Sequence, residues 1–311
     1  MQQRYVGNSG LRVSALSLGT MSWARETDEQ DASELLRTFV DAGGTLIDTA
    51  SSYSDGQAEA VLGSLVGDVV ARSEVVISTK AGLSTSNGRR RVDTSRSGML
   101  AGLDASLARL GTDYVDLWLA HAWDPNVPIQ ETLSALEFAV SSGRARYAGV
   151  SNFNGWQTAK AAAVAGFAIV ANQSEYSLLQ RRVESELIPA IDDAGLGLLA
   201  WAPLGRGVLS GKYRGQIPAD SRAAQNRLAG YVEPYLEPEA SRIVEAVAMA
   251  ARGLGRTAVD VSLSWLLSQH GVASSIVGAR TPVQLKEILA SQLTPLPPEI
   301  ARALEDVSLR P

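Results

Sequence analysis

Short hydrophobic runs rich in β-branched residues alternate with longer segments of helical periodicity along the whole chain. The first run, ALSLGT at 15–20, precedes a segment at 31–42 in which apolar residues recur every three or four positions. Continued alternation predicts strands at 15–20, 45–50, 75–80, 115–121, 145–151, 168–176, 196–204 and 274–279. Helices are predicted at 31–42, 58–66, 97–110, 129–142, 155–165, 183–194, 239–254, 259–270 and 282–291.

Strand–helix alternation is typical of parallel sheets, because parallel strands need a long crossover connection. Repeated along one chain, it favours a closed (β/α)8 TIM barrel that occupies residues 1–311 as one domain. The alternative is a doubly wound open sheet, but no G-x-G-x-x-G fingerprint follows the first strand. RYVGNSGLRVS at 4–14 predicts an N-terminal β-hairpin that caps the barrel. The long segment 205–238, after the seventh strand, predicts a functional loop.

The composition narrows the class of protein. Hydrophobic residues make up 45% of the chain, and the net charge of −5 includes no basic block that would neutralise a nucleic acid. The chain has no cysteine and two histidines, so no metal-ligand cluster of sensible spacing is predicted. The N-terminus has no secretion signal pattern, and the longest apolar run, 161–171, is too short to cross a bilayer. We expect a soluble cytoplasmic protein that binds neither nucleic acid nor membrane.

Three polar residues fall at the carboxyl ends of consecutive predicted strands, where barrels carry their chemistry. Asp48, Lys80 and His121 end the second, third and fourth strands, and Tyr53 lies in the loop after the second. Alternation along the strands turns Lys80 and His121 into the barrel mouth. Tyrosine, with an ordinary pKa of about 10, is a poor acid at neutral pH. We therefore predict that Lys80 lowers the pKa of Tyr53 and that Asp48 holds Lys80 charged. His121 would then hydrogen-bond a substrate oxygen or take part in proton relay.

With these residues in place, the sequence resembles the aldo-keto reductase family over nearly its whole length. Beside the four residues stand GTMSW (19–23), DTASSY (48–53), GVSNF (149–153), NQSEYSLL (172–179), WAPLGRGVLSGKY (201–213) and GARTPVQLKEIL (278–289). The pattern is most similar to the bacterial branch that includes the potassium-channel β-subunit relatives. The resemblance implies that NADPH reduces an aldehyde or ketone to an alcohol by hydride transfer, with Tyr53 as the general acid.

The resemblance also implies a place for the nicotinamide. Ser151, Asn152 and Gln173 match the residues that hold its carboxamide, and Trp201 matches the aromatic side chain stacked on its ring. Further cofactor contacts are implied at Thr20, Met21, Asp48, Ala202, Pro203, Leu204, Gly205, Arg206, Lys212, Arg222, Gly278, Arg280, Gln284 and Glu287.

NADPH is favoured over NADH because Arg280 stands where a helix begins, with Thr281 able to cap it and Pro282 fitting its first turn. A helix N-terminus with an arginine suits a 2′-phosphate. Ile288 stands where the family commonly has asparagine, so one hydrogen bond to the adenine should be missing.

The substrate is expected to be a small carbonyl compound chosen by the loops at 21–28, 82–91, 123–127 and 215–236, with Trp23 and Trp123 lining the pocket. The arginine run at 89–91 is interpreted as a solvated charge run, with an acidic substrate or the cofactor as the alternative. Two other functions stay open. One is a cofactor-sensing binding protein with slow or vestigial reductase activity. The other is an unrelated barrel lyase or isomerase in which Lys80 forms a Schiff base.

Overall fold

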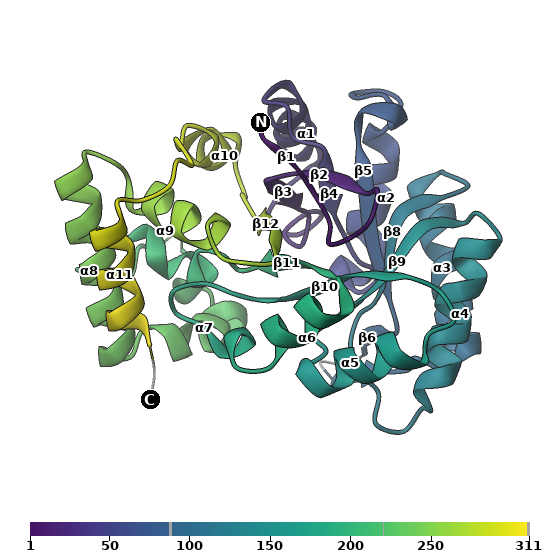
Figure 1. Ribbon diagram of the computed structural model, residues 1–311. Helices are drawn as coiled ribbons and strands as arrows, with labels where there is room; N and C mark the ends of the chain where they lie inside the picture. Colours follow the sequence, from purple (N-terminus) through teal and green to yellow (C-terminus); the bar gives the residue numbers. More distant parts are fainter. Residues whose placement is uncertain (87–88, 220, 310–311) are drawn as a thin grey trace.

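The computed structural model describes residues 1–86, 89–219 and 221–309, and in these residues eight parallel strands close into a barrel (Figure 1). The strands are β3 (Leu16–Gly19), β4 (Leu46–Asp48), β5 (Val76–Ala81), β8 (Val115–Ala120), β9 (Ala145–Ser151), β10 (Ile169–Glu175), β11 (Gly197–Trp201) and β12 (Val272–Val277). They pair in this order, and β12 pairs with β3 to close the ring. The predicted barrel is confirmed, and the open sheet is wrong.

Helices follow the strands and form the outer layer (Figure 1). They are α1 (Glu29–Asp41), α2 (Gln57–Leu65), α3 (Arg96–Leu110), α4 (Ile129–Ser141), α5 (Gly155–Val164), α6 (Leu187–Ala194), α7 (Asn226–Val232), α8 (Pro238–Leu254), α9 (Ala258–Leu267), α10 (Pro282–Leu289) and α11 (Pro298–Ser308). The predicted helices match α1–α6 and α8–α10 to within a few residues. The predicted start of α6 at 183 is wrong, because Arg182–Glu184 form a separate 3-10 turn, η3.

Helix α1 illustrates how the local sequence sets these elements. Asp28 caps it, accepting a 2.8 Å hydrogen bond from the backbone N–H of Asp31. Leu35, Leu36 and Phe39 recur at helical spacing and are fully buried against the sheet. A polar cap followed by one apolar stripe is therefore enough to define where this helix starts and which face it buries.

A hairpin closes the amino end of the barrel, as predicted. Strands β1 (Gln3–Tyr5) and β2 (Arg12–Ser14) pair antiparallel. Val6, Leu11 and Val13 of this hairpin form one buried cluster with Leu117 and Leu119 from the barrel interior. Because apolar side chains fill this end, the polar interior residues gather at the opposite, carboxyl end.

In its described residues, the segment 205–238 contains several short helices. They are η4 (Gly205–Ser210), η5 (Arg222–Ala224), α7 and η6 (Glu233–Tyr235). Arg206 fixes it to the barrel through a bidentate pair with Glu175, at 3.0 and 2.9 Å. The same guanidinium lies 3.8 Å from the ring centroid of Tyr231. One arginine thus anchors a segment that local periodicity does not resolve into elements.

A second hairpin, which was not predicted, follows β5. Strand β6 (Leu83–Ser86) pairs antiparallel with β7 (Arg89–Val92), in a register that sets Leu83 opposite Val92. It leaves the barrel directly after Lys80 and Ala81, at the carboxyl end of β5. The hairpin therefore rises beside the barrel mouth.

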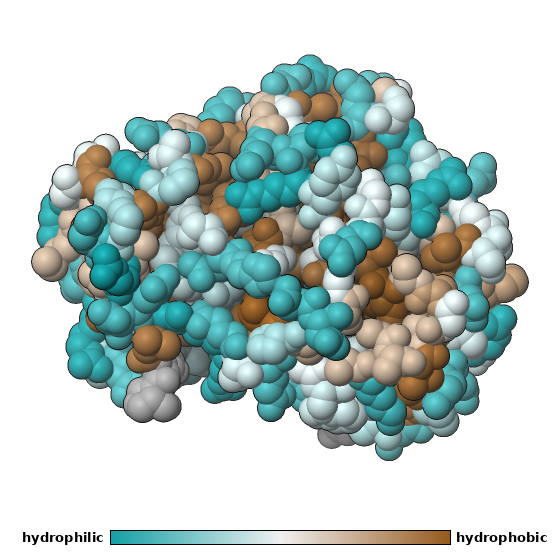
Figure 2. All heavy atoms as spheres, in the orientation of Figure 1, coloured by the Kyte–Doolittle hydropathy of each residue, from teal (hydrophilic) through white to brown (hydrophobic). Residues whose placement is uncertain are grey.

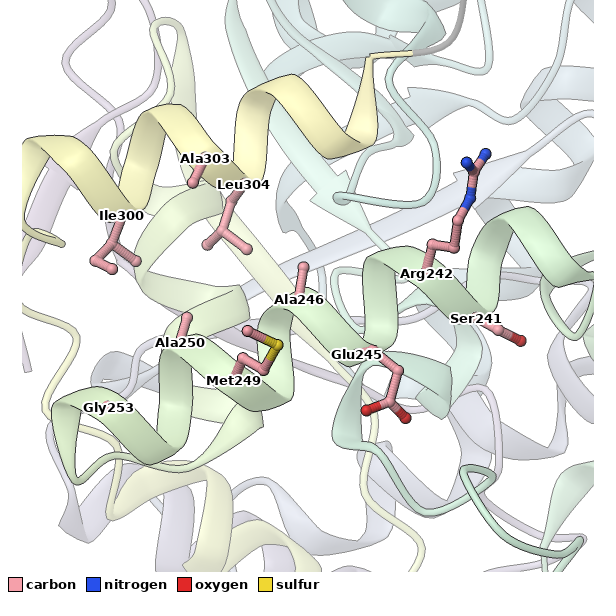
Figure 3. A pocket seen from close by; sticks show the side chains of 10 residues that line it. All are labelled: Ser241, Arg242, Glu245, Ala246, Met249, Ala250, Gly253, Ile300, Ala303 and Leu304. Carbon is pink, nitrogen blue, oxygen red and sulfur yellow. The ribbon is translucent and has the colours of Figure 1, made fainter.

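A groove of about 590 Å³ lies in the outer layer between α8 and α11. Figure 3 shows the side chains that line it. The groove is lined mostly by small and apolar side chains of the two helices, among them Ala246, Met249, Ala250, Ile300, Ala303 and Leu304. None of the predicted site residues lines it. On the face shown in Figure 2, hydrophilic residues predominate between smaller hydrophobic groups. Within the described ranges, no helix has both the length and the apolar character that a membrane crossing requires.

Candidate active site

The ammonium of Lys80 joins three of the four predicted catalytic residues. It donates to Asp48 Oδ2 at 2.8 Å, to the Thr49 carbonyl at 2.8 Å and to the Tyr53 hydroxyl at 3.4 Å. Lys80 has no exposed surface and Asp48 is also buried. All three N–H groups of the ammonium thus have acceptors, and the buried charge is paired.

Tyr53 is held by an unusual turn. It opens η1 (Tyr53–Gly56), in which Ser54, Asp55 and Gly56 all have positive φ, at 50°, 54° and 88°. The Ser54 hydroxyl donates to the Trp23 carbonyl at 2.7 Å. Strained backbone of this kind persists only where surrounding contacts hold it, and it concentrates at functional sites.

The buried carboxylate of Glu59 links this turn to neighbouring elements. Glu59 of α2 accepts hydrogen bonds from Thr79 Oγ1 at 2.5 Å and from Arg109 Nε at 2.8 Å. A Cβ built on Gly56 would lie 2.7 Å from the same Arg109 nitrogen. Thr79 precedes Lys80 on β5, so one network connects the Tyr53 turn to the strand that carries Lys80.

His121 follows β8 and completes the predicted set. Its backbone N–H donates to the Ala81 carbonyl at 2.9 Å. Its ring lies edge-to-face with Tyr53, with centroids 6.1 Å apart and an interplanar angle of 79°. Nδ1 lies 3.4 Å from Ser52 Oγ. Ser52 was not singled out from the sequence, although it lies beside Tyr53 in the DTASSY motif.

The protonation states of these groups follow from burial and charge. Burial lowers the pKa of Lys80, but Asp48 and Tyr53 outweigh burial and raise it above its ordinary value. Burial also lowers the pKa of His121 far below its ordinary value, and the charges of Lys80 and Arg90 add to this effect. Lys80 is therefore charged at neutral pH, whereas the His121 imidazole is neutral.

The predicted lowering of the Tyr53 pKa is wrong. Burial raises the pKa of Tyr53 above its ordinary value, and the charge of Asp48 adds to this. The Lys80 ammonium opposes both effects without overcoming them. The sequence shows that a cation is a neighbour of the phenol. It does not show that the folded chain excludes enough water from the phenol to raise its pKa instead of lowering it.

The residues expected to hold the nicotinamide carboxamide are hydrogen-bonded to the catalytic group. Trp201 Nε1 donates to Asn152 Oδ1 at 3.1 Å, and Asn152 Nδ2 donates to Ser151 Oγ at 3.1 Å. The Ser151 hydroxyl donates to the Gln173 carbonyl at 3.0 Å. Gln173 Nε2 then reaches Asp48 Oδ1 at 2.8 Å. One continuous chain therefore runs from Trp201 to Asp48.

The backbone around this chain also fits a close-fitting ligand. Asn152 has a positive φ of 58°, as does Ala202 at 49°, directly after Trp201. Trp201 itself is only half-buried, so part of its ring surface is open for stacking. Polar amides, a half-exposed indole and strained backbone at one rim suit the flat, amide-bearing nicotinamide.

The other residues predicted to contact the cofactor near the barrel mouth differ in their exposure and in the hydrogen bonds that they already make. Thr20 donates through its N–H and its hydroxyl to the Asp48 carbonyl, at 2.9 and 3.2 Å. Met21 is 41% exposed. After β11, Pro203 and Gly205 are buried, Leu204 is half-buried and Lys212 is exposed. The Arg206 guanidinium already binds Glu175, and the side chain of Arg222 lies outside the described part of the structure.

Helix α10 begins as predicted. Thr281 caps it, accepting from the Gln284 N–H at 3.4 Å, and Pro282 stands in its first turn. The Gln284 side chain accepts from the Arg280 N–H at 3.0 Å. Gly278 and Glu287 are exposed, whereas Ile288 is buried in the outer core. Two N–H groups at this helix start, those of Arg280 and Gln284, thus already have acceptors.

The two tryptophans predicted for the substrate pocket behave differently. Trp23 has no exposed surface and belongs to the larger cluster of buried hydrophobic residues. Its predicted role in lining the substrate pocket is therefore wrong. A tight turn, closed by a 3.0 Å bond from the Thr27 N–H to the Ser22 carbonyl, packs it inward. Trp123 is half-exposed and packs edge-to-face on Phe153 and Trp156, with centroids 5.3 and 5.1 Å apart. A pocket role for Trp123 stays a prediction.

The geometry also bears on the Schiff-base alternative and on metals. A Schiff-base lysine must lose its proton and meet a substrate carbonyl, but Lys80 has a raised pKa, no exposed surface and three acceptors. The lyase or isomerase interpretation is therefore disfavoured. Across the described residues, no group of three His, Asp or Glu side chains could hold a metal ion.

Comparison with known proteins shows which family the chain belongs to. The chain is 36% identical over 317 residues to a probable voltage-gated potassium channel subunit beta of Oryza sativa subsp. japonica, covering 99% of this chain and 96% of that protein. It is 37% identical over 298 residues to the L-glyceraldehyde 3-phosphate reductase of Escherichia coli (strain K12), covering 92% and 86%. The model of the aldo/keto reductase family matches residues 15–308. The chain belongs to this family of oxidoreductases, which act on carbonyl compounds with a nicotinamide cofactor.

Proposed function

We propose that this protein reduces an aldehyde or ketone to an alcohol with NADPH, using Tyr53 as the general acid. The observation that carries the proposal is the convergence of Tyr53, Lys80 and His121 at the barrel mouth, with Asp48 behind Lys80. A bound nicotinamide cofactor would supply the hydride to the carbonyl carbon. The chain's own residues would position the carbonyl and supply the proton.

The raised pKa of Tyr53 suits a proton donor, because the phenol stays protonated until a substrate oxygen becomes basic. Its hydroxyl oxygen accepts from Lys80, and its own hydrogen has no acceptor among the described residues. After proton transfer, the Lys80 ammonium would stabilise the phenolate that is left. This stabilisation of the phenolate is the same effect by which Lys80 opposes the rise of the Tyr53 pKa.

His121 would orient the carbonyl as a neutral donor. Its lowered pKa keeps the ring uncharged at neutral pH. If the Ser52 hydroxyl donates to Nδ1, the ring proton lies on Nε2, which can donate to the substrate oxygen. Two donors, Tyr53 and His121, would then converge on one oxygen.

Replacing Tyr53 with Phe tests the mechanism. Loss of a general acid should reduce turnover by about 10²–10⁴-fold, while NADPH binding, followed by protein fluorescence, stays close to that of the parent. The matched control is Tyr213→Phe, which removes a hydroxyl that accepts from the Ala223 N–H at 3.4 Å and contacts none of the four residues. Near-parental turnover in Tyr53→Phe would overturn the proposed role of the phenol.

The preference for NADPH rests on Arg280 at the start of α10. Arg280→Met should weaken NADPH binding more than NADH binding, because only NADPH carries the 2′-phosphate. Lys286→Met is the control, since Lys286 lies in the same helix and pairs with Glu34 at 2.8 Å. Equal effects of Arg280→Met on both cofactors would contradict this assignment.

The channel-subunit relative favours a second candidate, a cofactor-sensing binding protein with slow or vestigial reductase activity. The reductase relative, named for L-glyceraldehyde 3-phosphate, favours catalysis on a phosphorylated aldehyde. Steady-state assays with 4-nitrobenzaldehyde, a generic activated aldehyde, separate the two. Many turnovers per chain support the enzyme, whereas a single slow oxidation of bound NADPH supports the sensor.

A further inference from the structure

The β6–β7 hairpin brings a positively charged side chain to the mouth of the proposed active site. The chain leaves β5 at Ala81, one residue after Lys80, and turns at Gly82, which has a φ of 87°. A Cβ at Gly82 would lie 2.8 Å from Thr94 Cγ2, so the turn is tightly packed. The root of the hairpin is therefore fixed beside Lys80.

The strand register sorts the arginines of the hairpin onto two faces. Leu83 pairs with Val92, and Thr85 pairs with Arg90. Directly opposed and alternate residues share one face of an antiparallel pair, so Arg90 shares a face with Leu83 and Val92. Leu83 is buried, Val92 is half-buried, and Arg90, nearer the tip of the hairpin, is exposed and accessible to a ligand. The side chain of Arg91, on the other face, is 76% exposed.

The charge of Arg90 also acts on His121 in the proposed active site. Arg90 lies close enough to His121 for its charge, together with burial and the charge of Lys80, to lower the pKa of that imidazole. Lys80 is neutralised by Asp48, and Arg91 pairs with Asp93 at 3.8 Å. Among the described residues, Arg90 has no carboxylate partner. A guanidinium left in this state is matched in shape and charge to a carboxylate or a phosphate.

We propose that Arg90 is a specificity-determining residue that binds an anionic group on the carbonyl substrate. The substrate would be an aldehyde or ketone with a carboxylate or phosphate a few bonds from the carbonyl. The oxygen would meet Tyr53 and His121 while the anionic end meets Arg90. This inference rests on the proposed reductase function and deepens it by naming the substrate class.

Two matched pairs of aldehydes test the proposal in the full-length protein with NADPH. Succinic semialdehyde is compared with butanal, and glycolaldehyde phosphate with glycolaldehyde, at a pH above the ordinary pKa of histidine. The readout is the ratio of kcat/KM for the anionic over the neutral member of each pair. The parent protein should favour at least one anionic member by about tenfold or more, the factor supplied by one modest charged hydrogen bond.

Arg90→Gln should lower that ratio towards one, chiefly through a higher KM for the anionic aldehyde. Arg91→Gln is the matched control from the opposite face of the hairpin, and it should keep the parental ratio. Whichever pair shows the preference identifies the anion as carboxylate or phosphate. Added salt should reduce the preference of the parent and leave that of Arg90→Gln nearly constant.

Three outcomes would overturn the proposal. They are a parental ratio near one in both pairs, an unchanged ratio in Arg90→Gln, or equal losses in Arg90→Gln and Arg91→Gln. In each case, reduction of the neutral aldehydes would leave the proposed reductase function standing. Failure of the folded, NADPH-binding parent to reduce any of the four aldehydes would instead overturn the reductase function, and the inference with it.

Discussion

Gln173 donates a 2.8 Å hydrogen bond to Asp48 across the barrel mouth, although 125 positions separate them in the chain. Lys80 occupies the other carboxylate oxygen, so Asp48 is held from both sides. The amide of Gln173 is therefore a direct link between the residues expected to hold the cofactor and the residues expected to do the chemistry.

Replacing Gln173 with Leu should leave one oxygen of the buried Asp48 without this partner. Loss of one partner of a buried polar group costs about 1–3 kcal/mol of unfolding free energy, which chemical denaturation can measure. The same change in an Asp48→Leu background, which removes both carboxylate oxygens, gives the coupling between the two residues. Equal losses in both backgrounds would show that the hydrogen bond does not stabilise the fold.

Asp48→Asn should destabilise the protein strongly, because it leaves the Lys80 charge buried without a counter-charge. Breaking a buried ion pair costs about 3–5 kcal/mol. Since Asp48 raises the pKa of Lys80 against the effect of burial, its removal should lower that pKa. Lys80 would then lose its proton more readily, and turnover should fall as pH rises. Lys80→Met in the Asp48→Asn chain should recover part of the lost stability, and a further loss would contradict this account.

Gly56→Ala tests the turn that holds Tyr53. The substitution places a side chain at a φ of 88° and against Arg109, which Glu59 holds in place. Gly67→Ala is a matched control, because its φ is 101° and nothing lies within 4 Å of the added Cβ. Both should lose more than about 1 kcal/mol of unfolding free energy from backbone strain. Only Gly56→Ala should also lower kcat, and equal kcat values would argue against positioning of Tyr53 by this turn.

The lowered pKa of His121 predicts a stability that depends on pH. The folded chain keeps this imidazole neutral, whereas the unfolded chain protonates it below about pH 6.5. The unfolded state then binds more protons, so His121 reduces the unfolding free energy as pH falls, by up to roughly 1.4 kcal/mol per pH unit. His121→Asn should show a shallower acid-side decline in denaturation experiments. His270→Asn, which removes the other histidine from the surface, is the control, and identical slopes for His121→Asn and the parent would contradict the prediction.

Local sequence determined a large part of this protein. Alternating and helical periodicities placed the eight barrel strands, because each pattern depends only on which face of an element is apolar. Strand ends and parity then brought Asp48, Lys80 and His121 to one rim. The strongest local signals, such as the Thr281 cap of α10, were also reproduced in the structure.

Other features depended on contacts between distant segments. The β6–β7 hairpin and α11 have weak local patterns and were not predicted. Trp23 was predicted at the barrel rim from its place after a strand, but a turn in the folded chain buries it. The pairing of Gln173 with Asp48 exists only because the barrel closes. The acidity of Tyr53 was decided in the same way. A sequence shows which charges can be neighbours, but the electrostatic balance at a phenol depends on how much water the folded chain excludes from it.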